Sequence, residues 1–286
     1  MRKPSNLPAG DKHNRTAAKM KLTDAQLKQL ETDGFIVIPD RFSEAEVTAI
    51  RSRLPKLFSQ QDEANVIERN SGVVRTAMGL HLRDELFANL VRHPRLIEPA
   101  QQILGEPMYV QQVKVNVKAA FSGEVWQWHT DFATHHGEDG VRKPLALNLH
   151  ILLDEVTDFN GPLYFLPGSH RESEHAATLD DETTSYPLWV TDHDRVREMA
   201  NRSGIVAAKG KPGTVLVFHD TLIHGSPNNM SPWDRSIFSL IVNPVSNAYT
   251  TATRPDYKHH RDLTPIEPVA ADCLEDYVTR LEAPAA

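Results

Sequence analysis

The sequence predicts a mainly β domain with flanking helices, folded as a sandwich or barrel. From Tyr109 onward, apolar and polar residues alternate with a period of two over several short segments, which is typical of half-buried strands. Turn signals such as Asn160-Gly161 and Pro212-Gly213 separate these segments, and short strands spaced in this way favour a sandwich or barrel. Because the helical patterns come mainly before the strands, we expect the helices to cover the outside of one sheet.

The N-terminal part predicts helices after a polar segment. Residues 1–20 lack the apolar core of a secretory signal, and we expect them to form a mobile tail before a single domain over 21–286. Thr23 with Gln26, and Ser43 with Glu46, have the spacing of capping boxes, which begin helices. The predicted elements are helices from Thr23 to Gly34, from Ser43 to about Phe58 and from Pro94 to Leu104, and a buried strand over 35–38.

The strands follow, and the first of them has a polar face. Its valines share one side, while Gln112, Lys114 and Asn116 share the other. Polar groups on a barrel strand need partners, so we expect them to line a cavity; exposure to solvent is the alternative. The predicted strands cover 109–118, 124–131, 144–153, 162–166, 214–219 and 235–243.

The segment 171–210 interrupts this pattern. It is long and polar, and it contains the acidic run Asp180-Asp181-Glu182, which we expect to be a solvated face. A helix is predicted near 193–201. Long insertions in compact domains are often active-site lids, so we expect this segment to lie over one end of the barrel as a lid.

Composition limits the classes of function. Hydrophobic residues make up 40% of the 286 residues and charged residues 24%, as in ordinary globular proteins. The net charge of −7 lacks the basic excess of a nucleic-acid surface, and no apolar run is long enough to cross a membrane. A single cysteine, Cys273, rules out an intrachain disulfide and suits the cytoplasm. Homodimerisation stays open.

The fourteen histidines cluster in the middle of the chain and indicate a metal. His129 and Asp131 are two residues apart on a predicted strand, so both side chains can reach one ion. The third ligand must come from elsewhere: His224 is preferred, and His219 competes with it. Two histidines and one carboxylate leave three positions open on the ion, as in non-haem iron(II) oxygenases. These positions admit a 2-oxo acid and then dioxygen.

Arg235 strengthens the prediction of a metal site. It lies eleven residues after His224, on the next predicted strand. A guanidinium there can hold the distal carboxylate of 2-oxoglutarate through two parallel hydrogen bonds. Trp126 and Trp128 flank the ligand pair as walls of a barrel would.

Four segments within about residues 22 to 245 form a recognisable combination. They are Trp128-His129-Thr130-Asp131-Phe132, Asn160-Gly161-Pro162-Leu163, Pro167-Gly168-Ser169-His170 and His224-Gly225-Ser226 with Arg235. In these segments the chain resembles the phytanoyl-CoA dioxygenase superfamily and is most similar to its ectoine hydroxylase branch.

The resemblance implies a double-stranded β-helix (jelly-roll, cupin-like) core and a hydroxylase reaction. It implies iron(II) bound by His129, Asp131 and His224, and dioxygen as co-reactant. It also implies 2-oxoglutarate held by Arg235. The residues that would assist Arg235 are Asn116, Ser226, Gln112 and Asn148.

Two departures from the ectoine hydroxylases concern the substrate. Those enzymes have an arginine at the position of Lys114 and a tryptophan at the position of His135. We therefore expect the substrate to be a small free amino acid or an amino-acid-like solute rather than ectoine. The predicted substrate-binding residues are Lys114, Trp128, Thr134 and His135. His135 and His136 could instead form a solvated loop.

Other functions, and other roles for several histidines, are also compatible with the sequence. Ectoine hydroxylation remains an alternative, as does hydroxylation of an acyl-CoA or lipid-like substrate, although the acidic chain disfavours the latter. A non-enzymatic jelly-roll protein would have no reason to keep this ligand set. His150 could face the cavity or lie in the core, and His170 is expected to tie a turn. His259 and His260 are expected to be solvated.

Overall fold

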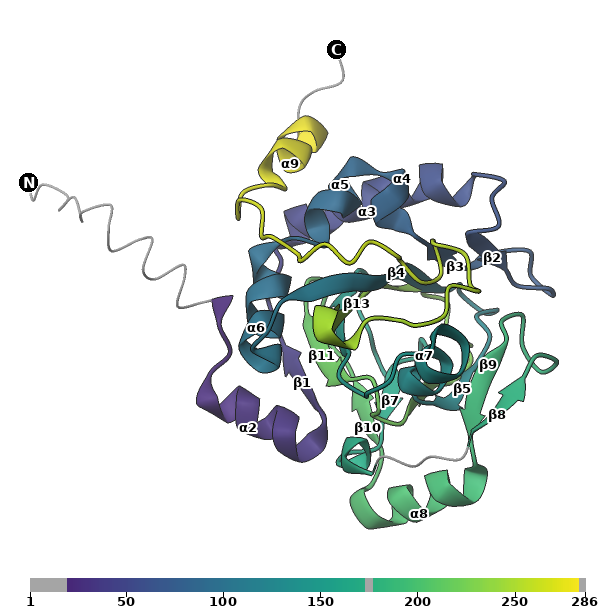
Figure 1. The fold of residues 1–286 in the computed structure, drawn as a ribbon. Helices are drawn as coiled ribbons and strands as arrows, with labels where there is room; N and C mark the ends of the chain where they lie inside the picture. Colours follow the sequence, from purple (N-terminus) through teal and green to yellow (C-terminus); the bar gives the residue numbers. More distant parts are fainter. Residues whose placement is uncertain (1–19, 173–176, 283–286) are drawn as a thin grey trace, which may run out of the picture.

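Two antiparallel sheets face each other, and helices cover one of them (Figure 1). The computed structural model describes residues 20–172 and 177–282. The predicted mobile tail therefore lies outside the described residues, except for Met20, which is buried. The larger sheet has the strand order β1-β11-β6-β13-β4-β3-β2, and the smaller sheet has the order β10-β7-β12-β5-β9-β8. This arrangement agrees with the predicted mainly β jelly roll.

The elements have the following bounds. The strands of the larger sheet are β1 (Phe35–Ile38), β2 (Asn65–Ile67), β3 (Val74–Met78), β4 (Met108–Lys118), β6 (Leu147–Leu152), β11 (Val215–His219) and β13 (Arg235–Pro244). Those of the smaller sheet are β5 (Trp126–His129), β7 (Leu163–Phe165), β8 (Ala177–Asp180), β9 (Leu188–Thr191), β10 (Val206–Ala208) and β12 (His224–Ser226). The helices are α2 (Asp24–Asp33), α3 (Glu44–Phe58), α4 (Leu80–Arg83), α5 (Glu85–Leu90), α6 (Pro94–Leu104), α7 (Asp131–Asp139), α8 (His193–Ser203) and α9 (Glu275–Glu282).

The N-terminal helices begin and end where the sequence predicts. Thr23 and Ser43 accept hydrogen bonds from the backbone of Gln26 and Glu46, and both capping boxes are complete. Gly34 ends α2 with a φ of 86°. A side chain there would also collide with His170, so this position requires glycine for two reasons.

The main core lies between the helices and the outer face of the larger sheet. Apolar residues of α3, α5 and α6 pack there against alternate residues of β4, β6 and β13, as predicted from the element order. Phe87 of α5, for example, stacks on Phe238 of β13 at 5.8 Å between ring centroids. The opposite face of these strands is left free to line a polar pocket between the sheets.

The strand predicted over 124–131 is shorter than expected, as is the one predicted over 144–153, which is observed as β6. Residues 124–131 were predicted as one strand, but β5 ends at His129 and Asp131 begins α7. Thr130 is the N-cap with extended backbone angles, and Gly140 ends the helix in the left-handed region. The alternative of a solvated loop at His135 and His136 is therefore wrong. Because Thr130 is extended, the side chains of His129 and Asp131 still point to the same side.

The segment 171–210 contributes strands as well as cover. Its described residues form β8, β9, β10 and α8, and the three strands are hydrogen-bonded into the smaller sheet. The helix predicted near 193–201 is confirmed as α8. The segment is thus partly a wall of the barrel; that it also acts as a lid remains a prediction. In the described part of the chain, no helix combines the length and apolarity needed to cross a bilayer.

The Phe87–Phe238 contact predicts a stability effect remote from the pocket. Phe87 is fully buried, and its removal leaves a cavity between α5 and β13. We expect Phe87→Ala to lower the free energy of unfolding by about 3–5 kcal/mol, as measured by urea denaturation. Leu82→Ala on the neighbouring α4 is the control, since this leucine is 49% exposed. Equal stability of the two variants would contradict this account of the core.

Candidate metal centre and active site

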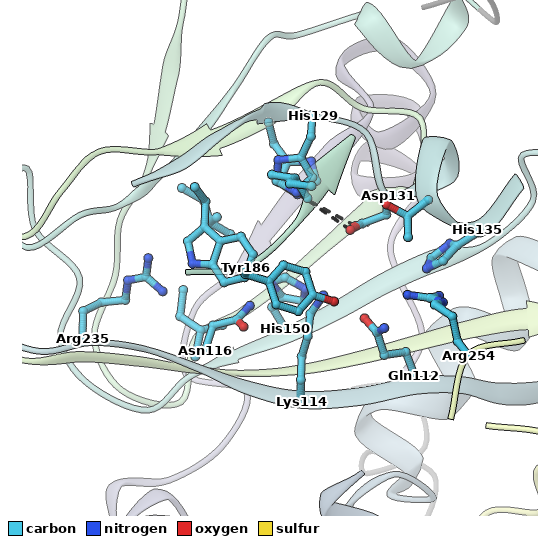
Figure 2. Close-up of a pocket in the computed structure, with 16 residues that line it drawn as sticks. Gln112, Lys114, Asn116, His129, Asp131, His135, His150, Tyr186, Arg235 and Arg254 are labelled. Atoms are coloured by element: carbon cyan, nitrogen blue, oxygen red, sulfur yellow. Dashed lines mark ion pairs between the residues drawn. The ribbon is translucent and has the colours of Figure 1, made fainter. Parts of the chain in front are cut away.

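The three predicted metal ligands lie together between the sheets. His129 ends β5, Asp131 begins α7, and His224 begins β12. In the antiparallel pair β5–β12, His224 is directly opposite His129. His129 Nε2 lies 3.9 Å from Asp131 Oδ1, and His224 Nε2 lies 3.8 Å from Asp131 Oδ2 (Figure 2). The sheet thus brings together ligands that are 95 residues apart in the chain.

Backbone carbonyls orient both imidazoles. His129 Nδ1 lies 2.6 Å from the carbonyl oxygen of Gln127, and His224 Nδ1 lies 2.9 Å from that of Leu222. A ring nitrogen at this distance from a carbonyl carries the proton and donates it, so each Nε2 keeps its lone pair. Both lone pairs belong to the nitrogens nearest Asp131. This outer support is what metal-ligating histidines normally have.

The protonation states of the three side chains also suit a cation. Burial, followed by the nearby His224, lowers the pKa of His129 to about 3. Burial also lowers the pKa of His224. Burial by itself raises the pKa of Asp131, but His224 and Lys114 lower it below its usual range. The result is two neutral imidazoles and one carboxylate, the forms in which these groups bind metals.

The distances test whether one ion fits. Ligand atoms about 2.1 Å from a shared ion are at most ~4.2 Å apart, and both measured separations are shorter than that. One ligand atom from each residue lies within 4.8 Å of the others, and all three residues are buried. A set of two histidines and one carboxylate on one side of an ion is the non-haem iron(II) arrangement. The residues present therefore fit the predicted iron.

The polar face of β4 forms the floor of the pocket. Gln112, Lys114 and Asn116 all line it, so the alternative of solvent exposure is wrong. The register with β13 fixes their order, because Arg235 is opposite the end of β4 that carries Asn116. Asn116 lies nearest Arg235, Lys114 lies in the middle below the triad, and Gln112 lies at the far end (Figure 2).

Arg235 is suited to hold a carboxylate. Only 1% of it is exposed, and it lines the pocket. Its Nε donates to the carbonyl of Gly161 at 3.0 Å, and its Nη2 donates to Ser226 Oγ at 3.2 Å. No acidic side chain in the described ranges forms an ion pair with it. Burial lowers its pKa to about 9, which leaves it cationic at neutral pH. A buried cation whose only partners are neutral favours an anion, and a 2-oxo diacid supplies one.

The neighbours predicted for Arg235 divide into two groups. Asn116 fits, since its Oδ1 is buried without a partner in the described structure, and Ser226 contacts the guanidinium itself. Gln112 and Asn148 do not fit, because both are opposite Ile241 on β13. That position is six residues from Arg235, roughly 20 Å along an extended strand.

Gln112 and Asn148 are therefore corrected. Neither can bind a carboxylate that Arg235 also holds. Gln112 lines the end of the pocket opposite Arg235 instead (Figure 2). Asn148 is fully buried with its Oδ1 3.3 Å from His150 Nε2, and it is not among the lining residues. The sequence pattern showed the face of each residue but could not give its position along the paired strand.

The prediction that Trp128 binds substrate is wrong, because Trp128 is next to His129 on β5 and neighbouring residues of a strand face opposite sides. A β-bulge turns Trp126 to the pocket instead. Between His224 and Ser226, β12 advances two residues while β5 advances three, from His129 to Trp126. Trp126 and His129 consequently share the pocket side. Trp128 points away and packs against the cluster around Leu166. The pocket wall is Trp126.

Helix α7 presents a second part of its face to the pocket. Thr134 and His135 lie three and four residues after Asp131, one turn of helix, and both line the pocket as predicted. His136 lies on the exposed side. Burial, followed by other charges, lowers the pKa of His135 to about 3, so its ring is neutral.

The structure also adds residues that the sequence did not single out. Tyr186, from the segment before β9, and Arg254 both line the pocket. Arg254 belongs to residues 248–262, here named the C-terminal strap, which passes beside α7 (Figure 1). Its guanidinium forms a bidentate pair with Asp139, at the end of α7. The sequence shows an acidic residue near the metal ligands and a distant arginine, but no motif spacing indicates that the two form a pair.

The remaining histidines have other tasks. His259 was expected to be solvated, but only 3% of it is exposed and its Nδ1 lies 2.8 Å from Asp139 Oδ2. The strap lies against α7, and that contact buries it. His150 lines the pocket and hydrogen-bonds Ser239 Oγ at 2.8 Å. His219 stacks on His170 outside the triad, with ring centroids 5.1 Å apart. Of the two candidates for third ligand, the structure therefore selects His224.

Comparisons with known proteins agree with this geometry. The family model described as phytanoyl-CoA dioxygenase (PhyH) matches residues 30–237. The chain is 38% identical over 269 residues to the L-proline trans-4-hydroxylase of Streptomyces griseoviridis, covering 88% of this chain and 98% of that protein. It is 37% identical over 232 residues to the ectoine dioxygenase of Sphingopyxis alaskensis, covering 78% of this chain and 76% of that protein.

Solved structures are similar over most of the chain. EctD from S. alaskensis in its apoform has a TM-score of 0.77 and 34% identity, over 87% of each chain. EctD with 2-oxoglutarate and 5-hydroxyectoine has a TM-score of 0.75 and 34% identity, over 87% of this chain and 86% of that one.

Two facing antiparallel sheets with this triad and a buried arginine define a non-haem iron, 2-oxoglutarate-dependent dioxygenase. The chain belongs to the phytanoyl-CoA dioxygenase family. The predicted fold, iron and 2-oxoglutarate are thereby confirmed.

The triad predicts which histidine is needed for iron. His224→Ala removes one of three ligands, so we expect iron affinity to fall by more than the roughly 10–100-fold that loss of an outer partner costs. His219→Ala is the matched control and should bind iron as the parent does. Calorimetric titration with iron(II) in the absence of oxygen measures the iron affinity of both variants. Loss of iron in His219→Ala with retention in His224→Ala would reverse the assignment.

The unpaired guanidinium predicts the cosubstrate site. Arg235→Leu removes a buried charge partner, a loss of about 2 kcal/mol or more, which corresponds to at least ~30-fold weaker 2-oxoglutarate binding. Calorimetric titration of the iron-loaded protein without oxygen measures it, and iron affinity should stay unchanged. Arg235→Lys keeps the charge without the two-pronged geometry and should be intermediate. Unchanged 2-oxoglutarate binding in Arg235→Leu would refute the assignment.

Proposed function

We propose that this enzyme hydroxylates an unactivated C–H bond of a small free amino acid or a compact amino-acid-like solute, with release of succinate and carbon dioxide. The observation that carries the proposal is Lys114. Its ammonium group enters the middle of the pocket floor, below the triad (Figure 2). Within the described ranges, no acidic side chain forms an ion pair with it.

The charges around Lys114 require an anion from outside the chain. Burial lowers the pKa of Lys114, and Asp131 opposes that change. When Asp131 binds a cation, its charge is no longer available to the lysine. Arg235 lies beyond Asn116 and serves the cosubstrate. The α-carboxylate of an amino acid is the small anion that suits a half-buried lysine in this position.

Bound iron(II) and 2-oxoglutarate supply the oxidising chemistry, with dioxygen as co-reactant. The residues of this chain position the metal, the cosubstrate and the substrate, and they exclude water from the pocket. His129, Asp131 and His224 hold one side of the metal site and leave the pocket side open. Arg235 and Asn116 fix one end of the pocket. Trp126, Tyr186 and Leu188 also line the pocket, and their bulk would keep water from the reacting carbon. Lys114 sets where the substrate carbon lies.

The relatives support this substrate class. One is an L-proline trans-4-hydroxylase and another is an ectoine dioxygenase. Ectoine itself is the second candidate, favoured by the similarity to EctD with 2-oxoglutarate and 5-hydroxyectoine. Lys114 and His135, which replace the residues expected in ectoine hydroxylases, favour an amino acid over ectoine.

An acyl-CoA or lipid-like substrate fits less well. Of the sixteen residues that line the pocket, only Leu163, Leu188 and Ile237 are aliphatic. A long acyl chain needs a continuous apolar groove. A protein that merely binds a ligand is also disfavoured, because it needs neither the ligand triad nor Arg235.

We propose a cytoplasmic location for the enzyme, supported by the single cysteine. A homodimer stays a prediction that a measurement of the oligomeric state would test.

Lys114 predicts a selective loss of substrate binding. A hydrogen bond to a charged group contributes about 1.5–3 kcal/mol, so Lys114→Met should raise the KM of the amino acid substrate by ~10–150-fold. The 2-oxoglutarate affinity should not change. Lys209→Met is the control, since this exposed lysine pairs with Asp158 away from the pocket.

The measurement is substrate-stimulated succinate release with iron(II), 2-oxoglutarate and a panel of amino acids, ectoine and acyl-CoAs. Mass spectrometry should show one added oxygen on an amino acid. Stimulation by ectoine or an acyl-CoA alone would sink the amino acid proposal. An unchanged KM in Lys114→Met would sink the role of Lys114.

A further inference from the structure

The end of the pocket opposite Arg235 carries hydrogen-bonding groups that the proposed chemistry leaves unused. His135 of α7, Gln112 of β4 and Arg254 of the C-terminal strap meet there (Figure 2). Asp131 lies on the triad side of this group. Any substrate that reaches below the triad must extend toward these three side chains or toward the cosubstrate.

His135 is the least satisfied of the three. Only 2% of its surface is exposed. No hydrogen bond joins either ring nitrogen to another described residue. Nδ1 is buried away from solvent, whereas Nε2 is not among the buried atoms that lack a partner. Because the ring lines the pocket, Nε2 is the atom that a ligand can reach. A buried polar group without a partner is costly, so a bound molecule has a strong reason to pair with it.

The chemistry of the ring indicates what it pairs with. A neutral imidazole has one N–H group and one lone pair. An orphaned buried N–H is rarer than an under-used acceptor, so the proton belongs on Nε2 rather than on the sealed Nδ1. His135 therefore offers the pocket a hydrogen-bond donor.

Arg254 offers a second donor from a fixed position. Its Nε and Nη2 donate to the two carboxylate oxygens of Asp139, and Glu138 is 3.6 Å from its Nε. Within the described structure, Nη1 has no partner. The strap that carries Arg254 is held by its own bonds, since the backbone N–H groups of Thr250 and Thr251 both donate to the carbonyl of Asp139. The guanidinium is thus preorganised beside His135.

Gln112 is fixed as well. Its Nε2 donates to the carbonyl of Lys258 at 2.7 Å, which ties β4 to the strap. This bond determines which way the amide faces. The subsite consists of two donors, one on a helix and one on the strap, held against a strand by bonds that do not involve a ligand.

We propose that His135, together with Arg254, determines substrate specificity by donating hydrogen bonds to a second oxygen-bearing group of the substrate. The substrate is then an amino acid whose side chain ends in a carboxamide or carboxylate, with its α-carboxylate at Lys114. This inference rests on the proposed amino acid hydroxylation and narrows it. Amino acids with apolar side chains leave both donors unpaired and are disfavoured, because buried donors that lose their partners are penalised.

The test compares three substrate types on three forms of the enzyme. The substrates are glutamine and asparagine, glutamate and aspartate, and the apolar norvaline and proline. The enzymes are the parent, His135→Phe and His135→Gln. Phenylalanine removes the donor at similar size, whereas glutamine keeps an N–H donor. His136→Phe on the exposed side of α7 is the matched control. KM and kcat for each substrate are read from succinate release and product mass, and 2-oxoglutarate affinity is measured separately.

We expect the parent to prefer one oxygen-bearing type over the apolar type. His135→Phe should raise KM for the preferred substrate by at least ~10-fold, corresponding to one lost hydrogen bond to a partner of this kind. His135→Gln should restore most of it, and 2-oxoglutarate affinity should not change in any variant. Preference for the amides or for the acids identifies the group.

Two outcomes overturn the inference while leaving the proposed function intact. One is a parent that prefers norvaline or proline. The other is His135→Phe with an unchanged ratio of KM values between polar and apolar substrates. Absence of turnover with every amino acid, while ectoine or an acyl-CoA is oxidised, instead overturns the proposed function. A circular dichroism melt identifies any variant that fails to fold, and His135→Gln then carries the comparison.

Discussion

The antiparallel pairing of β5 with β12 is the contact on which the site depends. It places His129 opposite His224, and the carbonyls of Gln127 and Leu222 then orient both rings toward Asp131. The pairing has only one residue pair on each side of a bulge. A slip of either strand by one residue would move its histidine to the other face of the sheet and separate the two imidazoles. The rest of the barrel holds this short ladder in register.

The larger sheet sets the spacing of the polar side chains along the pocket. One face of β4, β6 and β13 packs on the helices, and the other carries polar side chains into the pocket. Because strands are regular, the order Arg235, Asn116, Lys114, Gln112 is also an order in distance from the cosubstrate end. The end of the pocket at Arg235, the middle at Lys114 and the far end at Gln112 thus follow one another along β4, with the metal ligands above the middle.

How much the sequence could predict follows from how local each feature is. The capping boxes at Thr23 and Ser43 and the alternation in β4 are set by neighbours in the chain, and all were predictable. The triad was predictable because its residue types are rare in that combination. Gln112 and Asn148 were misplaced because a strand register is a property of two strands together, and so is the bulge that turns Trp126 to the pocket. Trp128 was misplaced although its position next to His129 already puts it on the other face of the strand. Arg254 and His259 were missed because they act through Asp139, more than a hundred residues away.

The C-terminal strap has a consequence for how such enzymes diverge. The family match ends at residue 237, so the segment that carries Arg254 lies beyond the part of the chain that defines the family. The metal ligands with Arg235 and one wall of the pocket are therefore encoded in separate stretches. Substitutions or small insertions in the strap can change what is oxidised without touching the residues that do the oxidising. A chain built in this way can explore new substrates at little risk to its chemistry, which makes the strap the natural target for altering selectivity.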